Sequence, residues 1–404
     1  MSKISIKNLI KIQKGKGIRM IETKWAEIDL DCLNHNLNEI RKRVGSKVKI
    51  AAVVKANGYG HGCLEMSGAL LAGGADVICV SSINEAIEIR KEYMGAEILV
   101  LGFVPLENVY EAINFDIIQT VFSFEQGKSI AIAAKNLNKR VKVHIKIDTG
   151  MNRTGFYPDQ KTLEEILELS SLESLEIEGI YTHLATADET DKTFSFKQFE
   201  SFKLFLAELE DLGLCIPIKH ISNSAAVIDL PEMNMDMVRP GIILYGVYPS
   251  EQVKKVLLNL KPVMTLKATV IHVKKLKEAG GISYGLNYIG KKGQLIATVP
   301  VGYADGYTRL LSNESQMIIN GKKVDEVGNI CMDQCMIDVT DVEGVRVGTE
   351  VILFGTDGLN VINVSELALK CGEIPYELLC SIGRRVPRLY LKGGVVVKKV
   401  NYLE

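Results

Sequence analysis

Between Lys47 and about Leu260, short aliphatic and β-branched runs alternate with longer amphipathic stretches, which include 83–93, 123–137 and 195–212. Such alternation indicates βαβ units and a parallel sheet. Eight runs are present: KVKIAAVVK, DVICVS, EILVLG, DIIQTV, RVKVHIKID, LEIEGIYTH, IPIKHISN and MDMVRP. Eight units in about 215 residues fit a (β/α)8 TIM-type barrel better than an open sheet. No GxGxxG motif follows the first run, which weighs against a dinucleotide-binding fold.

The pattern changes after residue 260. The runs TLKATVIHVKKL, GQLIATVPV, SQMIING, CMIDV and TEVILFG are separated by turn residues instead of long helices. This pattern predicts a mostly β C-terminal domain, with two short helices near its end, one capped by Ser365 and one opened by Pro375. The expected organisation is therefore a basic N-terminal extension at 1–21, a barrel at 22–260 and a β domain at 261–404.

Composition argues against several classes of partner. The net charge of −1 gives no reason to expect nucleic acid, and no apolar run approaches the ~18 residues of a membrane helix. Eight cysteines without a CxxC pair, and six histidines without ligand-like spacing, make a metal site unexpected. Unpatterned cysteines in so long a chain are typical of reduced thiols in a cytoplasmic protein. The basic segment 1–21 is interpreted as a tail or an upstream start, with a targeting arm as the alternative.

Lys55 ends the apolar run IAAVVK and enters the loop ANGYGHG. Catalytic groups of barrel enzymes lie where strands end and βα loops begin. A partly desolvated lysine there favours its neutral amine, which can form an imine with an aldehyde. Gly58, Gly60 and Gly62 would allow a tight backbone path close to a ligand. The alternative is a solvated lysine beside a turn.

Four further runs end in polar side chains suited to a small anionic ligand: Arg153, His183, Ser224 and Arg239. Arg153 could bind a carboxylate in a bidentate manner, although Lys146 and Asp148 on the same strand leave a structural ion pair as the alternative. Ser224 would open a helix whose first N–H groups could bind a phosphate. In the β domain, Tyr284 lies in a glycine-containing turn, and a tyrosine can act as acid or base if neighbouring cations lower its pKa.

Taken together, these segments resemble the bacterial alanine racemase family. The match runs from WAEIDLDCLNHNL at 25–37 to RRVPRLY at 384–390. Seven motifs occur in the family's order: VVKANGYGHG, KIDTGMNRTGF, HISNSAA, VRPGIILYG, SYG, GYADGY and CMDQ. The resemblance implies an isomerase that interconverts L-alanine and D-alanine with pyridoxal 5'-phosphate. It also implies a head-to-tail homodimer with shared active sites, and D-alanine supply for cell-wall peptidoglycan.

The resemblance also assigns roles to individual residues. Lys55 would hold the cofactor as a Schiff base and act as one base, and Tyr284 of a partner subunit would be the other. The cofactor phosphate would be held by Tyr59, Ser224, Gly241 and Ile242, and its ring nitrogen would face Arg239, supported by His183. The substrate would be bound by Arg153, Met332 and Asp333. Lys146 matches a lysine that is often carbamylated, and Asp188, Tyr303 and Arg309 match the substrate entryway.

The chemistry of racemisation agrees with this assignment. The α-proton must leave from one face and return on the other, so two bases on opposite faces suffice. By resemblance, Lys55 serves the D enantiomer and Tyr284 the L enantiomer. The cofactor supplies the electron sink. A permanently charged arginine opposite the ring nitrogen should keep that nitrogen unprotonated and suppress transamination.

Two positions depart from the family pattern. Asn329 stands where arginine is frequent, and Arg384 stands where many members carry a tyrosine that lines the site. The second departure leaves serine or a broader set of amino acids as the alternative substrate. Two further classes of protein could share such a barrel. A non-catalytic PLP-binding barrel would lack the β domain, and a PLP-dependent decarboxylase would carry a glutamate in place of Arg239 and a cysteine acid.

Overall fold

The structure is a computed structural model that describes residues 22–404. The expected extension at 1–21 lies outside the described residues. The chain forms two compact units. The barrel unit comprises Cys32–Val263 and Ile374–Cys380. The β unit comprises Met264–Glu373, Ser381–Glu404 and the described residues up to Asp31.

An eight-stranded parallel sheet forms the barrel unit, and each of the eight expected runs contains one strand. The strands are β2 (Lys49–Val53), β3 (Val77–Val80), β4 (Ile98–Val100), β5 (Ile118–Val121), β6 (Val141–Lys146), β7 (Leu175–Tyr181), β8 (Ile218–His220) and β9 (Met237–Val238). Their order is β8-β7-β6-β5-β4-β3-β2-β9. Two backbone hydrogen bonds join the sheet's ends, from the Asp236 amide to Lys219 (3.0 Å) and from the Arg239 amide to Ser222 (2.9 Å). The predicted (β/α)8 barrel is confirmed.

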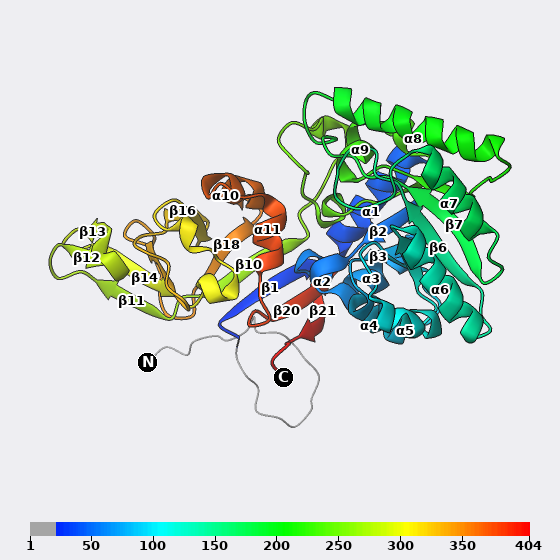
Figure 1. Cartoon of the computed structure of the whole chain (residues 1–404). Helices are drawn as coiled ribbons and strands as arrows, with labels where there is room; N and C mark the ends of the chain where they lie inside the picture. Colours follow the sequence, from blue (N-terminus) through cyan, green and yellow to red (C-terminus); the bar gives the residue numbers. More distant parts are fainter. Residues whose placement is uncertain (1–21) are drawn as a thin grey trace. The chain divides into compact units, whose positions relative to one another are not determined.

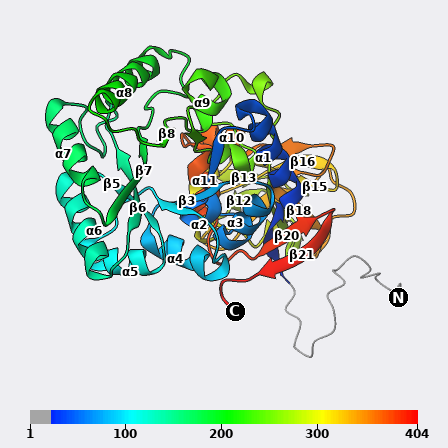
Figure 2. The same cartoon turned by 90° about the vertical axis from the view of Figure 1, so that its right-hand side faces the viewer.

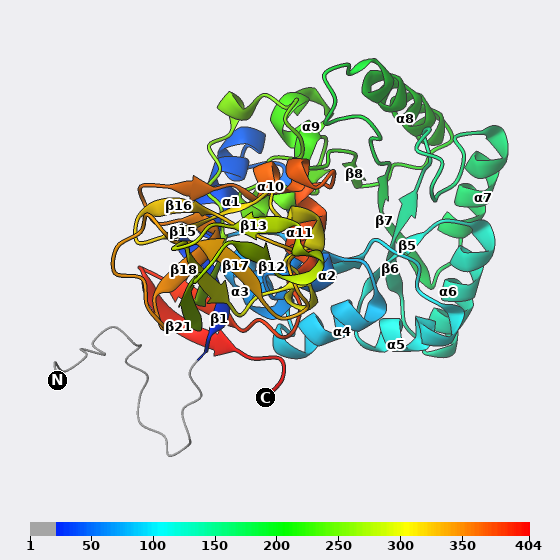
Figure 3. The same ribbon diagram turned by 90° about the vertical axis from the view of Figure 1, so that its left-hand side faces the viewer.

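Helices cover the outside of this sheet, with α4 to α8 following one another around the strands (Figures 1, 2 and 3). The helices of this unit are α1 (Leu30–Val44), α3 (Cys63–Ala72), α4 (Ile83–Glu92), α5 (Val109–Asn114), α6 (Phe124–Asn136), α7 (Gln160–Ser170), α8 (Thr193–Asp211) and α9 (Ser224–Asp229). Helix α11 (Pro375–Ser381) belongs mainly to the same unit, but it contributes to the cavity and is not part of this outer cover. The expected helices at 83–93, 123–137 and 195–212 correspond to α4, α6 and α8. Ser82, Ser123 and Asp159 cap α4, α6 and α7 through their side chains. Within residues 22–404, no helix combines the length and apolarity needed to span a membrane.

The β unit is built from three sheets. The largest contains β1 (Lys24–Asp29), β10 (Met264–Thr269), β15 (Gln316–Ile319), β16 (Lys322–Asp325), β18 (Glu350–Thr356), β19 (Val361–Ile362), β20 (Arg388–Lys392) and β21 (Val395–Val400). The second contains β11 (His272–Lys275), β14 (Leu295–Val299) and β17 (Cys335–Asp338), and the third is the hairpin of β12 (Gly280–Ile282) and β13 (Tyr288–Gly290). This hairpin lies beyond β11 and β14 (Figure 1). The short helix α10 (Val364–Lys370) is capped by Asn363, not by Ser365 as expected, because the Asn363 side chain accepts from the Ser365 amide.

Two segments lie outside the units to which the boundary at residue 260 assigns them. Strand β1 pairs antiparallel with β10 and parallel with β20, so it belongs to the β unit. Helix α11 belongs mainly to the barrel unit, although Pro375 opens it as expected. The alternating pattern of a strand shows which side chains are buried but not which sheet the strand joins.

Candidate active site

A cavity of about 860 Å³ opens in the barrel unit, at the ends of the strands. All five polar strand-end residues predicted from the sequence line it: Lys55, Arg153, His183, Ser224 and Arg239. Tyr59, Lys146, Gly241 and Ile242 line it as well. Four of the lining residues are lysine or arginine, and Asp188 is the single carboxylate among the described residues there. The cavity therefore suits a small anionic ligand.

Lys55 starts a left-handed turn. The segment α2 (Lys55–Tyr59) has φ values of 53° at Ala56 and Asn57, 60° at Gly58 and 51° at Tyr59. The turn ends at Gly60, where φ is 82°. A left-handed conformation costs roughly 1–2 kcal/mol for each residue with a side chain, and such strain clusters at functional sites. The expected tight path through the glycines is confirmed, and it brings Lys55 and Tyr59 to the same cavity.

The environment of Lys55 favours its neutral amine. Partial burial lowers the pKa of the amine, and the positive charge of Arg153 lowers it further. Cys380 and Glu85 act in the opposite direction, more weakly. An amine with a lowered pKa beside an open cavity is suited to condense with an aldehyde or to accept a proton.

Gly241, Tyr59 and Ser224 form a cradle at one wall of the cavity. The Gly241 amide donates to the Ser224 hydroxyl at 2.9 Å. A Cβ at Gly241 would lie 2.5 Å from the Tyr59 hydroxyl oxygen, so only glycine lets this tyrosine approach. The helix-terminus interpretation needs a correction, because the amides of Ala225 and Ala226 already donate to the Asn223 side chain at 3.1 Å. Hydroxyl groups, more than the helix N–H groups, would therefore contact an anion here.

Arg239 is a buried cation behind the cavity, with 4% of its surface exposed. Its guanidinium donates to the carbonyls of Thr182 (2.8 Å) and Ile221 (3.1 Å). It also contacts Nδ1 of His220 at 2.7 Å and Nδ1 of His183 at 3.2 Å. Burial and the charge of Arg239 hold the pKa values of both histidines well below their usual range. Both imidazoles are thus neutral acceptors.

Lys146 and Asp148 do not pair through their side chains. The Asp148 carboxylate accepts from the amides of Gly150 (2.9 Å), Asn152 (3.0 Å) and Arg153 (2.9 Å), and so shapes the loop that carries Arg153. Burial would raise the pKa of Asp148, but these hydrogen bonds lower it. Burial lowers the pKa of Lys146 to about 7, with Asp148 opposing and the two arginines of the cavity contributing. The neutral form of the Lys146 amine is therefore favoured more than in an ordinary, solvated lysine.

Sequence reasoning missed Tyr376 and Tyr181. Tyr376 lines the cavity from α11, and its ring centroid lies 6.0 Å from that of Tyr59. Tyr181 ends β7, and the guanidinium carbon of Arg239 lies 4.9 Å from its ring centroid. The run LEIEGIYTH placed Tyr181 at a strand end, where it could have been found, whereas no local signal placed α11 beside the barrel.

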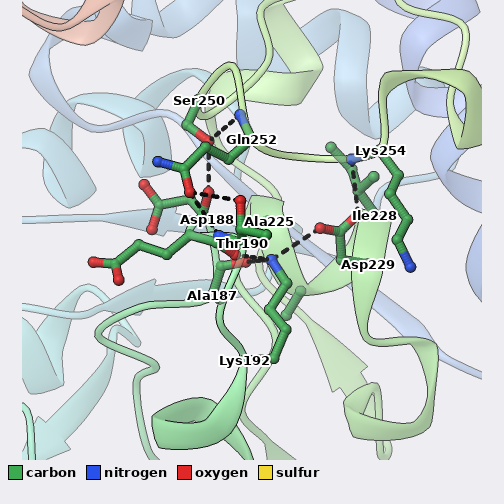
Figure 4. A network of polar contacts seen from close by, with 12 residues as sticks. Ala187, Asp188, Thr190, Lys192, Ala225, Ile228, Asp229, Ser250, Gln252 and Lys254 are labelled. Carbon is green, nitrogen blue, oxygen red and sulfur yellow. Dashed lines mark hydrogen bonds and ion pairs between the residues drawn. The ribbon is translucent and has the colours of Figure 1, made fainter.

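Asp188 lies in a network that ties two loops together at the cavity (Figure 4). The Ser250 hydroxyl donates to the Asp188 carbonyl at 2.6 Å. The Lys192 ammonium donates to the Ala187 carbonyl at 2.7 Å and forms an ion pair with Asp229 at 2.9 Å. These contacts hold the loop that follows β7 at Ala187 and at Asp188.

The remaining predicted residues lie in the β unit, where three motifs are joined. Asn329 donates to the Tyr284 carbonyl at 2.5 Å, and its own carbonyl accepts from the Ser283 hydroxyl at 2.5 Å. The Tyr303 and Ala304 amides donate to the carbonyls of Cys331 (3.1 Å) and Met332 (3.0 Å). These hydrogen bonds connect the loops that carry Tyr284, Tyr303, Met332 and Asp333. All four side chains are exposed, as is that of Arg309. The departure at Asn329 has a structural role, since its amide group fixes the backbone of Tyr284.

Arg384, the second departure, also lies in the β unit and is exposed. Its guanidinium donates to the Tyr402 carbonyl at 3.5 Å. Arg385, beside it, forms an ion pair with Asp333 at 2.7 Å. Arg384 does not appear among the residues that line the barrel-unit cavity.

Comparison with known proteins gives one consistent result. The family Alanine racemase, N-terminal domain, matches residues 28–249, and Alanine racemase, C-terminal domain, matches residues 263–390. An alanine racemase of Methanococcus maripaludis is 50% identical over 91% of this chain and 98% of its own length. The solved alanine racemase of Clostridium difficile 630 superposes with a TM-score of 0.91 and 42% identity, covering 96% of this chain and all of that one. The Bacillus anthracis alanine racemase, solved with bound L-Ala-P, gives a TM-score of 0.89 and 36% identity over 96% of this chain and 99% of its own.

The turn after Lys55 generates a stability prediction. A Cβ at Gly60 would lie 2.2 Å from the Leu379 carbonyl oxygen, whereas a Cβ at Gly74, where φ is also positive, meets nothing within 4 Å. We expect Gly74→Ala to lower the free energy of unfolding by about 1–2 kcal/mol, from backbone strain alone. Gly60→Ala should cost at least ~1 kcal/mol more, because the backbone must also shift. Urea unfolding of the cofactor-free variants, compared at the same protein concentration, measures both free energies of unfolding. Equal decreases in the two variants would contradict the close approach of Gly60 to the Leu379 carbonyl.

Proposed function

The chain belongs to the alanine racemase family, and from this premise we propose that it interconverts L-alanine and D-alanine with Lys55 and Tyr284 as the two bases. The observation that carries the proposal is that five polar strand-end residues converge on one cationic cavity. One of them is Lys55, whose amine has a lowered pKa. Arg239, in place of a carboxylate, argues for racemisation over decarboxylation.

Enzymes of this family depend on pyridoxal 5'-phosphate, and the cavity fits that group. The glycine at 241 leaves room beside the Tyr59 hydroxyl that a Cβ would fill, and four basic side chains face the same space. Lys55 would bind the cofactor aldehyde, and Tyr59, Ser224, Gly241 and Ile242 would hold its phosphate. When bound, the cofactor withdraws electrons from the substrate's Cα–H bond.

The protein's own residues then handle binding and protons. Arg153 would bind the substrate carboxylate, because a guanidinium can bind a carboxylate through two parallel hydrogen bonds. The loop that carries Arg153 is held in place by the Asp148 carboxylate. Lys55 Nζ would exchange the α-proton on the D side, and the Tyr284 hydroxyl would do so on the L side. Arg239 would face the ring nitrogen, supported by His183, and would keep that nitrogen unprotonated.

We propose that Tyr284 reaches the cavity from a second copy of the chain in a head-to-tail homodimer. Tyr284 is 74% exposed and lies in the β unit, whereas the cavity is lined by the barrel unit. Met332 and Asp333 would come with it to contact the substrate. A cytoplasmic enzyme is supported by eight cysteines without a disulfide, and supply of D-alanine to cell-wall peptidoglycan is the corresponding role.

The substrate assignment is tested on a panel of L-amino acids, with products separated by chiral chromatography. L-alanine should be racemised with a kcat/KM at least ~10-fold above that of L-serine. Borohydride should fix the cofactor to Lys55, and Lys55→Ala should abolish turnover. If L-alanine were left unchanged while another amino acid turned over, the alanine assignment would be wrong.

Tyr284→Phe should separate the two bases. A racemase must slow equally in both net directions, so the informative measurement is exchange of the α-proton with deuterated solvent for each enantiomer separately. Exchange from L-alanine should fall by at least ~100-fold, while exchange from D-alanine is much less affected. Tyr288→Phe, on the same hairpin, is the control, because its hydroxyl accepts from Gln294 at 2.8 Å. Unchanged exchange from L-alanine would remove Tyr284 from the mechanism.

We also propose that Lys146 is carbamylated and orients Arg153. Only the neutral amine reacts with CO2, and the pKa of Lys146 is lowered to about 7, so the adduct should form above pH 7 and be lost as the pH falls below it. A carbamate signal should appear by 13C NMR with labelled bicarbonate at pH 8, weaken at pH 6 and be absent in Lys146→Met. Lys142→Met should retain the signal, because the contact with Glu178 raises the pKa of Lys142. A signal that persists in Lys146→Met would refute the assignment.

A further inference from the structure

A chain of buried side chains runs inside the barrel from Arg239 to the opposite end of the strands. Arg239 Nη1 contacts His220 Nδ1 at 2.7 Å, and His220 Nε2 contacts His144 Nδ1 at 2.8 Å. His144 Nε2 then contacts the Glu178 carboxylate at 3.3 Å. His220 and His144 are 0% and 2% exposed. The proposed function uses Arg239 but does not use the other three residues.

The chemistry of the first member fixes the direction of every hydrogen bond. A guanidinium can only donate, so Nδ1 of His220 must accept and its proton must lie on Nε2. That proton is donated to Nδ1 of His144, whose own proton therefore also lies on Nε2 and is donated to Glu178. An ionised carboxylate accepts without donating, so Glu178 can receive this proton. This series of hydrogen bonds therefore begins at a cation, Arg239, and ends at an anion, Glu178, with one donor and one acceptor at every contact between them.

The anionic end is held near the amino-terminal ends of the strands. Glu178 lies 2.6 Å from the Lys142 ammonium, which also lies 3.2 Å from Glu97. Burial would raise the pKa of Glu178, but its hydrogen bonds with His144 and Lys142 lower it. The side chain of Glu178 is 12% exposed and that of Lys142 is 41% exposed, so the chain connects the buried cation with a partly solvated ion pair.

The surrounding residues are shaped to hold the imidazoles. The ring of Tyr181 stacks on His220, with centroids 4.6 Å apart and planes inclined by 13°. A Cβ at Gly179 would lie 2.5 Å from the His144 ring, so only glycine at this strand position leaves room for it. Both histidines are therefore fixed in orientation by packing as well as by hydrogen bonds.

We propose that His220, His144 and Glu178 form a positioning relay that fixes the orientation of the Arg239 guanidinium. The inference rests on the proposed function, in which Arg239 faces the cofactor's ring nitrogen. Without the acceptor at Glu178, the Nε2 proton of His144 would be buried without a partner, which favours a change of tautomer or ring orientation at His144. Because His144 contacts His220 and His220 contacts Arg239, such a change would also disturb the orientation of the guanidinium. The three residues are positioning residues and touch no ligand themselves.

The relay is tested first without cofactor. Solid-state NMR of protein carrying 15N-labelled histidine distinguishes imidazole tautomers, and His144→Gln and His220→Gln assign the signals. At pH 7 both residues should be neutral with the proton on Nε2. A proton on Nδ1 of either residue, or an imidazolium at either, would overturn the relay. This measurement holds even if the cofactor proposal fails, in which case the wild-type protein would not bind pyridoxal phosphate.

The second measurement concerns Arg239 through the cofactor. Glu178→Leu should give a mixture of His144 tautomers and raise the Kd for pyridoxal phosphate about tenfold, the loss expected for one hydrogen bond to a charged group. Glu178→Gln keeps an acceptor and should restore the single tautomer and most of the affinity. Glu176→Leu, two residues earlier on β7, is the control, since the carboxylate of Glu176 forms an ion pair with Arg140 at 3.8 Å and not with a member of the relay. Altered His144 signals with unchanged affinity would show a structural role alone, and would refute the relay.

Discussion

Arg239 is a permanent cation buried at the active site, and the groups around it are those that a buried cation requires. A guanidinium removed from water must have its donors met by the protein, because an unpaired buried charge is strongly destabilising. Here the acceptors are neutral: two main-chain carbonyls and the imidazoles of His183 and His220. Arg239 and burial in turn keep those imidazoles uncharged. The cation therefore stays available to face a ligand without being neutralised by a carboxylate.

On the other side of the cavity, the backbone of the turn after Lys55 is strained. The left-handed turn after Lys55 places several non-glycine residues at positive φ, and the close packing of Gly60 and Gly241 leaves no space for larger side chains. Such a turn persists only when its surroundings hold it. The barrel sheet provides that support, because its closed hydrogen bonding leaves the strand ends with little freedom to move. A rigid wall thus presents the Lys55 amine to the ligand.

The two units divide the proposed chemistry between them. The barrel unit supplies the residues that would bind the cofactor, and the β unit carries Tyr284 on loops joined by Asn329 and by main-chain hydrogen bonds. A tyrosine that is to act as a base needs a defined position, and these contacts fix its backbone while leaving its side chain exposed. The proposed shared site in a dimer would explain why so exposed a residue lies on so well-connected a loop.

The sequence alone determined the barrel and the identity of its strand ends. Period-two and helical patterns are local, and the carboxyl ends of eight parallel strands must meet at one face, so Lys55, Arg153, His183, Ser224 and Arg239 could be predicted to converge. Other features depended on the tertiary structure. Strand β1 joins the β unit, Tyr376 reaches the cavity from a distant segment, and Asp148 binds backbone amides and not Lys146. The relay from Arg239 to Glu178 links four residues far apart in the chain. Its direction follows from which atoms meet in space, and no local pattern of residues encodes that.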